Sequence, residues 1–348
     1  MSVGAERVLT QRERNRTLLE RQLLLERKAL SIPKALERVG GIQAQYAPSM
    51  YIGLWSRLAE FERESLTRAL ERRTVVQGTL MRTTIHLVSK GDYWPIALAI
   101  RDVRREGWLA YRRGKATERD VLAAAKLVEG RLKEGATARA DLAEGLDSML
   151  FNGAGVWLDL VRIPLSGTWE RRRADMYAPA SEWVGPPGHA SPQSGLRLLI
   201  ERYLRGFGPA QPADVADWIG MGPKPVAAAI DKMSLRHFRD EQGKLLVDLP
   251  RAPLASAGAA APARFIPTWD ATLLVHARAT GILAEEDRPK VFSTKTPQSV
   301  PTFTLDGTVA GTWRYEKGKV KLDPFRKLAP AARAELEAEA DALATFHA

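Results

Sequence analysis

Two glutamines spaced two residues apart, Gln43 and Gln45, are the side chains of this sequence best arranged for chemistry. They follow Gly40-Gly41, and glycine readily takes the left-handed conformation in which many helices end. We expect an extended segment after these glycines, so that residues two apart point to the same side of the chain. Both carboxamides would then face one spot. An amide carries a donor and an acceptor but no titrating charge, so the pair could orient a water molecule or a sugar.

Helices are predicted on both sides of this segment. Thr10 is a suitable N-cap for a first helix, and Ser31-Ile32-Pro33 opens a second one that ends at Gly40-Gly41. A third helix is predicted after Pro48, with Ser49 as its N-cap. Two polar residues in a plain connection between helices are the alternative interpretation of the glutamine pair.

A hairpin is predicted over residues 74–88, which are rich in β-branched side chains and interrupted by Gly78. Alternation along its second strand places Arg82, Thr84 and His86 on one face. This polar face makes His86 a candidate for supporting the glutamines. A lone histidine is more often a structural residue, and that alternative stays open.

The order helix, helix, helix, hairpin recurs along the chain, and Ala-Asp-(Leu/Val)-Ala occurs at 140–143 and 213–216. This order is typical of a winged helix-turn-helix unit. We therefore predict a mainly α protein with β wings, an α+β fold of tandem winged-helix units followed by a small C-terminal β-barrel. The predicted boundaries are 1–117 for an N-terminal helix and the first unit, 118–194 for the second unit, 195–262 for the third unit with a linker, and 263–348 for the barrel with a terminal helix.

The C-terminal region differs from the rest in its short strands. Asp306-Gly307 and Lys317-Gly318 are sequences typical of two-residue hairpin turns. A final helix is predicted over 330–346. Asp270, at the entry to this region, is a second candidate for active-site support, although it would serve equally as the cap of a following helix.

Positive charge predominates in the chain, with 52 Lys and Arg against 41 Asp and Glu, a net charge of +11. This excess favours a polyanionic partner, nucleic acid first, although a general bias toward arginine is the alternative. Winged helices place one helix in the major groove and the wing along the backbone. On that basis the predicted DNA contacts are Tyr51, Trp55, Arg57, Arg82, Thr83, Thr84, Arg171, Arg172 and Arg173. Winged helices also bind proteins, and a run such as 171–173 is as often a solvated surface.

Cysteine is absent, and the five histidines show no spacing typical of a metal site. We therefore expect neither a metal nor another cofactor. No apolar run approaches the roughly 20 residues of a membrane span, and the charged N-terminus lacks a signal-peptide core. A cytoplasmic protein associated with the nucleoid, without a membrane partner, is expected.

Four motifs, spread over nearly the whole sequence, are similar to those of a known family: Gly41–Gln45, Arg82–Val88, Trp269–Leu274 and Asp306–Trp313. The chain resembles the winged-helix proteins related to the DNA glycosylases AlkZ and YcaQ. This resemblance implies a C-shaped molecule that wraps duplex DNA and excises N7-alkylguanines, including bulky adducts and interstrand crosslinks. The family carries either Gln-apolar-Gln or Gln-apolar-Asp. Gln43-Ala44-Gln45 is similar to the AlkZ branch and makes Gln43 and Gln45 the expected catalytic pair.

The resemblance also explains how catalysis could proceed without a strong acid or base. An N7-alkylguanine is already cationic, so the enzyme needs only to hold water near C1′ and stabilise an oxocarbenium-like sugar. A crosslinked base cannot swing fully into a closed pocket, which favours an open cleft. We expect a monofunctional DNA glycosylase that acts as a monomer on double-stranded DNA. The alternatives are a DNA-binding protein without catalysis, such as a transcriptional regulator, and a relative whose site has decayed.

Overall fold

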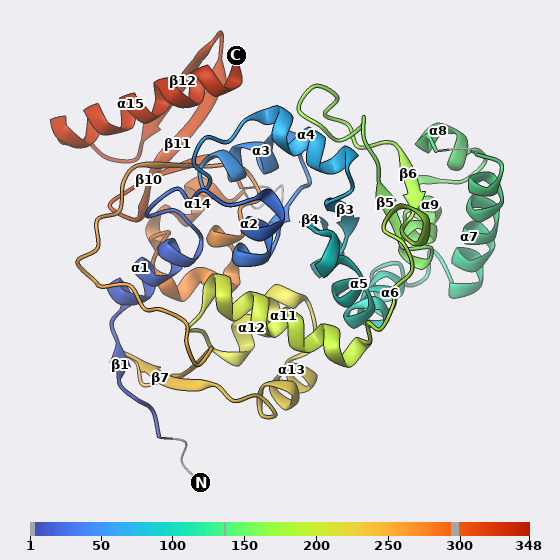
Figure 1. Cartoon of the computed structure of the whole chain (residues 1–348), viewed down its shortest axis with the longest axis horizontal. Coiled ribbons are helices and arrows are strands. Elements are labelled where there is room, and N and C mark those ends of the chain that lie inside the picture. Colours follow the sequence, from blue (N-terminus) through green and yellow to red (C-terminus); the bar gives the residue numbers. More distant parts are fainter. Residues whose placement is uncertain (1–3, 136, 294–298) are drawn as a thin grey trace.

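The computed structural model describes residues 4–135, 137–293 and 299–348. Helices and several small sheets make up the chain, as expected of an α+β protein (Figure 1). Helix α1 (Gln11–Arg21) is N-capped by Thr10, whose hydroxyl accepts a hydrogen bond from the backbone N–H of Glu13. Helix α2 (Ile32–Val39) ends at Gly40. Both features confirm the sequence predictions.

Helix α3 (Ala47–Trp55) begins two residues before the predicted cap. Pro48 fits its first turn, where a backbone N–H is not needed. The Ser49 hydroxyl lies instead 2.7 Å from the hydroxyl oxygen of Thr268, in the C-terminal region. Ser49 therefore ties the first helices to the C-terminal part of the chain.

A further helix, α4 (Arg63–Glu71), lies between α3 and the predicted hairpin. The helix directly before the hairpin is thus α4, where the sequence analysis expected the helix that carries Tyr51 and Trp55. Two more helices follow the hairpin, α5 (Lys90–Ala99) and α6 (Arg101–Tyr111). None of these three was predicted, and α6 borders the candidate site.

The central sheet has five strands in the order β2-β4-β3-β5-β6 and is open. Its strands are β2 (Ile42–Gln43), β3 (Val75–Thr79), β4 (Ile85–Ser89), β5 (Leu160–Arg162) and β6 (Tyr177–Pro179). Strands β3 and β4 confirm the predicted hairpin. Strand β3 also pairs antiparallel with β5, with Gln77 opposite Arg162 and Gly78 opposite Val161. The first and second predicted units therefore share one sheet.

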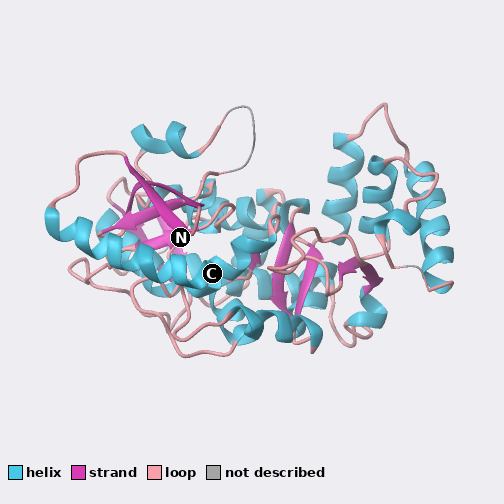
Figure 2. Cartoon of the chain, turned by 90° about the horizontal axis from the view of Figure 1, so that it is seen from above, coloured by secondary structure: helices cyan, strands magenta, loops and turns pink. Residues whose placement is uncertain are grey.

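The predicted order of helices also occurs in the second and third predicted units, with α11 (Pro192–Phe207) beginning three residues before the predicted boundary at 195. The second predicted unit contains α7 (Glu118–Lys133), α8 (Arg139–Leu142), α9 (Ser148–Trp157) and α10 (Ala180–Trp183). The third contains α11, α12 (Pro212–Ile219), α13 (Pro223–Ile230), β7 (Arg236–Asp240) and β8 (Leu245–Asp248). Strand β1 (Val8–Leu9) adds to β7 in parallel. Helices α7 to α9 lie at one end of the molecule (Figure 2).

The C-terminal strands form a four-stranded sheet in the order β12-β11-β10-β9. They are β9 (Arg264–Ile266), β10 (Thr302–Leu305), β11 (Thr308–Glu316) and β12 (Lys319–Pro324). In the described residues β9 and β12 do not pair, so this is an open sheet and the predicted barrel is not confirmed. The predicted turns Asp306-Gly307 and Lys317-Gly318 are present, with all four residues at positive φ.

Two helices complete this region. A short helix, α14 (Arg288–Val291), lies between β9 and β10 in the chain. The predicted terminal helix is present as α15 (Pro330–His347), which buries Leu336 and Leu343. These leucines share a hydrophobic cluster with Phe265 of β9, so α15 helps to cover the sheet.

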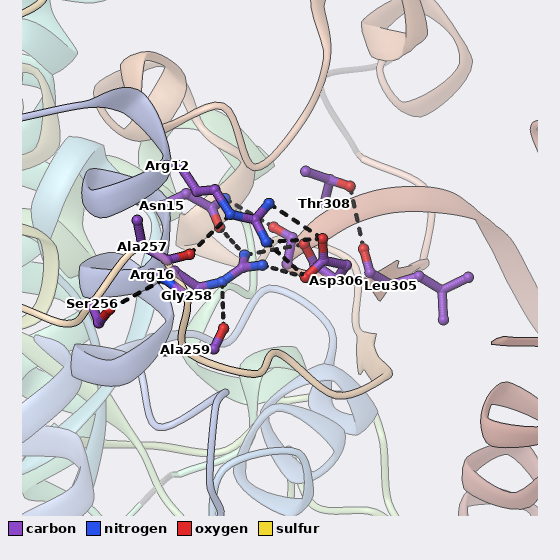
Figure 3. A network of polar contacts seen from close by, with 11 residues as sticks. Arg12, Asn15, Arg16, Ser256, Ala257, Gly258, Ala259, Leu305, Asp306 and Thr308 are labelled. Carbon is purple, nitrogen blue, oxygen red and sulfur yellow. Dashed lines mark hydrogen bonds and ion pairs between the residues drawn. The ribbon is translucent and has the colours of Figure 1, made fainter. Parts of the chain in front are cut away.

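Helix α1 fastens the linker and the C-terminal sheet together (Figure 3). The Nε atoms of Arg12 and Arg16 donate to the carbonyls of residues 257 and 259, at 2.9 and 2.8 Å. Both guanidinium groups also pair with Asp306, and the Asn15 amide donates to the carbonyl of Gly307 at 2.9 Å. The linker has no regular structure and is held by α1 at residues 257 and 259.

One large hydrophobic core crosses the predicted domain boundaries. It joins Leu18 of α1, Trp94 of α5, Trp218 of α12 and Ile266 of β9. The predicted units are therefore packed into one body.

Two further observations concern the described part of the chain only. None of its helices is both long and apolar enough to cross a membrane. No group of three or more acidic or histidine side chains in it is arranged to hold a metal ion.

Candidate active site

The glutamine strand β2 starts from two glycines in the left-handed conformation. Gly40 has φ of 85° and Gly41 φ of 80°, values that favour glycine. A Cβ at Gly41 would lie 3.1 Å from the carbonyl oxygen of Leu87 on β4. This tight turn brings β2 from the end of α2 onto the edge of the sheet, where Gln43 pairs with His86. The predicted extended segment is confirmed at Ile42 and Gln43, whereas Gln45 lies in a bend beyond the strand.

The two carboxamides lie in different environments. Gln43 is buried, and its Oε1 accepts a hydrogen bond from Nη2 of Arg82 at 3.3 Å. Gln45 is exposed, and its Oε1 accepts a hydrogen bond from the backbone N–H of Ile85 at 2.8 Å. Because both donors carry hydrogen, each amide oxygen is turned toward its partner and each NH₂ group points elsewhere. One lone pair of each oxygen remains for another donor.

Arg82 comes from the turn between β3 and β4. The sequence analysis put it on the strand, but it lies in a 3-10 turn, Met81–Thr83. Besides Gln43, its guanidinium hydrogen-bonds the carbonyl of Trp218 in α12. Burial lowers the pKa of Arg82 to about 10, and no carboxylate of the described residues pairs with it. Arg82 thus stays charged at neutral pH and places a cation against the Gln43 amide.

His86 lies beside Gln43 in the sheet and is buried. Its Nδ1 is 3.1 Å from the carbonyl oxygen of Thr84, so that nitrogen carries the proton and Nε2 is unprotonated. Burial, helped by the charge of Arg82, lowers the pKa of His86 to about 3. His86 is therefore neutral at neutral pH and a poor proton donor or acceptor there.

A cavity of about 520 Å³ opens beside Gln45. That volume falls in the range of small-molecule sites, roughly 300–1,000 Å³. The sheet contributes its floor, and α6 and α9 contribute its walls. The polar and aromatic side chains that line it are Gln45, Thr79, Arg82, Thr83, Trp108, Tyr111, Arg112, Phe151, Asn152, Arg162 and Tyr177. None of the residues that line it is a carboxylate.

Gln45 also borders a second cavity of about 230 Å³, on the side of the loop between β5 and β6 that carries Arg171, Arg172 and Arg173. Ala44, Gln77, Arg172 and Arg173 contribute to its lining. Gln45 therefore stands between two open spaces, whereas Gln43 lines neither and reaches the larger one only through Arg82.

Several cavity residues were missed by the sequence analysis. Tyr111 has 79% of its surface exposed although it is aromatic, and the Arg112 guanidinium lies 4.6 Å from its ring centre. Arg162 donates to the Thr79 hydroxyl at 3.1 Å. The run of an aromatic residue and cations at 111–115 was a usable signal, because bases stack on aromatic rings and phosphates pair with cations.

Three predicted DNA contacts on and after α3 are turned into the protein. Tyr51 is fully buried and bonds Thr67 through its hydroxyl at 2.9 Å. Arg57 is buried in an ion pair with Asp270 at 2.9 Å. Trp55 is half-buried beneath the guanidinium of Arg27, 4.4 Å from its ring centre. Tyr51 and Arg57 have no surface for DNA here, because α3 packs inside the molecule and α4 takes the position before the hairpin.

The hydrogen bonds of Asp270 are to residues other than the two glutamines. Asp270 accepts hydrogen bonds from Arg57 and from the backbone N–H and hydroxyl of Thr272, at 3.0 and 2.8 Å. It therefore caps the turn Ala271–Leu273, which is the alternative weighed from the sequence.

The remaining predicted contacts stay near the surface. Thr83 is exposed and lines the larger cavity, while Thr84 donates to the carbonyl of Met81. Arg171, Arg172 and Arg173 are exposed on the loop between β5 and β6. Arg172 donates to the hydroxyl of Tyr46 at 3.0 Å, which places this loop beside the glutamine strand.

The sequence profile of the family described as DNA glycosylase AlkZ-like matches residues 36–346. The chain belongs to this family. Its fold is also similar to that of Streptomyces sahachiroi DNA glycosylase AlkZ, with a TM-score of 0.78 and 20% identity over 98% of this chain and 96% of that chain. No curated protein matches the sequence.

Membership of the AlkZ-like family makes this chain a DNA glycosylase, with DNA as its partner and DNA repair as its role. The resemblance inferred from the four motifs is confirmed at the level of the family. The family identity favours an enzyme over a regulator of transcription.

Proposed function

We propose that this enzyme hydrolyses the N-glycosidic bond of cationic N7-alkylguanines in duplex DNA, bulky adducts and interstrand crosslinks among them. One observation carries the proposal: the cavity beside Gln45 has no carboxylate in its lining. His86, which pairs with Gln43 in the sheet, is neutral as well, because its pKa is about 3. Such a site has neither a carboxylic acid nor an imidazolium to protonate a neutral leaving base at neutral pH. A base that already bears a positive charge needs no such group.

The proposed nucleophile is a water molecule held between Gln43 and Gln45. Each amide oxygen has a lone pair beyond the one used inside the protein, so each can accept one water proton. Held in this way, the water oxygen keeps a lone pair free for C1′ of the sugar. Positioning and the amide dipoles then stabilise the developing oxocarbenium ion.

DNA binding is assigned to three tandem winged-helix units, supported by the repeated order of three helices and a hairpin. The exposed arginines at 171–173 and the cations around the cavity supply positive charge for the backbone. Arg112 and Arg162, which line the cavity, suit the phosphates that flank a lesion better than the cationic base itself. We further propose that the enzyme acts as a monomer on chromosomal DNA in the cytoplasm.

The test is base release from a duplex oligonucleotide with one N7-methylguanine, measured as abasic sites that alkali cleaves. Wild-type enzyme should release this base but not uracil, which is neutral. Gln43→Ala and Gln45→Ala should each lower the single-turnover rate constant, on the order of 100-fold. DNA affinity should change little, and Gln242→Ala, an exposed amide in the β7–β8 turn, serves as the control.

Two results would contradict the proposal in different ways. Release by the double glutamine variant at the wild-type rate would refute the assigned mechanism. Release of neutral bases, with none from N7-methylguanine or from a bulkier N7 adduct, would refute the substrate class.

A further inference from the structure

The turn that carries Arg82 has an unusual backbone. Arg82 has φ of 53° and Thr83 φ of 56°, so two consecutive residues with side chains are left-handed. Each such residue costs about 1–2 kcal/mol relative to its ordinary conformation. Conformations of this kind persist where the surroundings hold them, and they are concentrated at functional sites.

Helix α12 supplies the surroundings. The helix ends at Gly220, which is left-handed with φ of 79°. A Cβ at Gly220 would lie 3.0 Å from both the backbone nitrogen and Cγ of Arg82. The Arg82 guanidinium also hydrogen-bonds the Trp218 carbonyl in the last turn of this helix. The backbone and the side chain of Arg82 are thus both fixed against α12.

We propose that Arg82 is a positioning residue that fixes the carboxamide of Gln43 for catalysis. The proposal rests on the proposed role of the glutamines. An amide on a flexible side chain can flip, exchanging its oxygen and its NH₂ group. A guanidinium can only donate, so Arg82 selects the orientation in which the Gln43 oxygen faces it. Since the other end of the guanidinium is anchored on α12, the third unit sets the orientation of a catalytic side chain in the first.

This role differs from the phosphate contact predicted for Arg82 from the sequence. A phosphate contact needs a positive charge, which lysine also provides. Bridging two acceptors at a fixed angle needs the planar guanidinium, because an ammonium group is a compact point charge. Both terminal nitrogens of Arg82 are occupied within the protein, Nη1 by Trp218 and Nη2 by Gln43.

Two variants test the role from opposite sides. Arg82→Lys keeps the positive charge but replaces the planar guanidinium, with its two terminal donors, by a single ammonium group. Gly220→Ala keeps Arg82 itself but pushes a methyl group against it. Its matched control is Gly243→Ala, since Gly243 has φ of 76° and no other atom within 4 Å of the added Cβ. The readouts are the single-turnover rate of N7-methylguanine release, the dissociation constant for DNA and its salt dependence, and thermal unfolding.

Arg82→Lys should lower the rate constant by about 10- to 100-fold, the upper value being the cost of misplacing a catalytic group by about 1 Å. The affinity for DNA and its salt dependence should stay unchanged. Gly220→Ala should lower the rate well beyond Gly243→Ala. In a Gln43→Ala background Arg82→Lys should have no further effect, because both changes remove one interaction.

A folded Arg82→Lys enzyme with the wild-type rate would overturn the inference. That result is the one expected if Arg82 is a phosphate contact, because lysine also carries the charge that such a contact needs. If Arg82→Lys does not fold, equal rates for Gly220→Ala and Gly243→Ala overturn it. Wild-type activity in Gln43→Ala is a separate failure, that of the glutamine mechanism itself.

Discussion

The amide oxygens of Gln43 and Gln45 are both engaged inside the protein, one by a cation and one by a backbone N–H. The sequence analysis expected two equivalent amides facing one spot. It found the strand at Ile42 and Gln43 correctly, because the glycine pair before it is a local signal. It could not find the difference between the two environments, since Arg82 is 39 residues away in the sequence and reaches Gln43 only through a left-handed turn.

His86 provides a test at the scale of one residue. Its pKa of about 3 in the folded protein lies below the ordinary value of 6.5, so between these values the unfolded chain binds a proton that the folded one does not. The stabilising contribution of neutral His86 is therefore complete above about pH 6.5 and is lost as pH falls. Below that pH, His86→Gln should remove up to about 1.4 kcal/mol per pH unit of this acid dependence.

Denaturant unfolding of wild type and His86→Gln at pH 7, 6 and 5 measures the effect. The difference between the two proteins isolates His86, because the other titrating groups are common to both. If the two stabilities change in parallel with pH, the buried neutral state of His86 is wrong.

At the scale of elements, local turn signals were reliable and helix burial was not. Asp306-Gly307 and Lys317-Gly318 form the hairpin turns that their sequences predict. Tyr51 was expected on a DNA-facing helix, but its ring lies edge-on to Trp169 at 5.7 Å, from a distant loop. Contacts of this kind bury α3 on all sides, since every residue from Ala47 to Leu54 is buried. The nearly uniform apolar sequence of α3 was a signal of this burial that the sequence analysis did not use. Closure of the barrel has no such local signal, since it depends on edge pairing.

The contacts of α1 with the turn Asp306-Gly307 give a prediction at this scale. Gly307 has φ of 75°, and a Cβ there would lie 2.1 Å from Nη1 of Arg16. Gly318 has φ of 77° in the neighbouring turn, with open space around it. Gly318→Ala should lower the free energy of unfolding by about 1 kcal/mol from backbone strain alone. Gly307→Ala should lower it by a further 1–3 kcal/mol or so, because it also displaces Arg16.

Thermal or denaturant unfolding of both variants checks this prediction. Equal losses in the two glycine variants would show that the Arg16 contact contributes nothing to stability.

At the scale of the whole molecule, the charge of +11 is an electrostatic signal that needed no structure. Composition predicted a polyanionic partner, and the family identity agrees. The residues that contact DNA were harder to predict from the sequence than the kind of partner. Of the predicted contacts, Arg57 is buried in an ion pair, whereas Arg171, Arg172 and Arg173 are exposed. A charge run shows where cations are dense, but only packing shows which of them face solvent.

Salt dependence of DNA binding tests the proposed surface. The logarithm of affinity should fall linearly with the logarithm of salt concentration. Arg172→Ala should reduce that slope by about one, as expected for the loss of one phosphate contact. Arg197→Ala removes an exposed cation that pairs with Glu201 on α11, and it should leave the slope unchanged. A common slope for all three proteins would remove the loop from the DNA-binding surface.

The β3–β5 pairing has a consequence for how the cavity can adapt. Its floor is a continuous ladder, with Gln77 opposite Arg162 and Gly78 opposite Val161, while its walls come from α6 of one unit and α9 of the next. Rotating one unit against the other would break the hydrogen bonds between β3 and β5. The distance between the two walls of the cavity is therefore fixed. New lesion sizes would then be accommodated by trimming or enlarging side chains on the two helices, and a family of such enzymes could diversify there while the sheet stays unchanged.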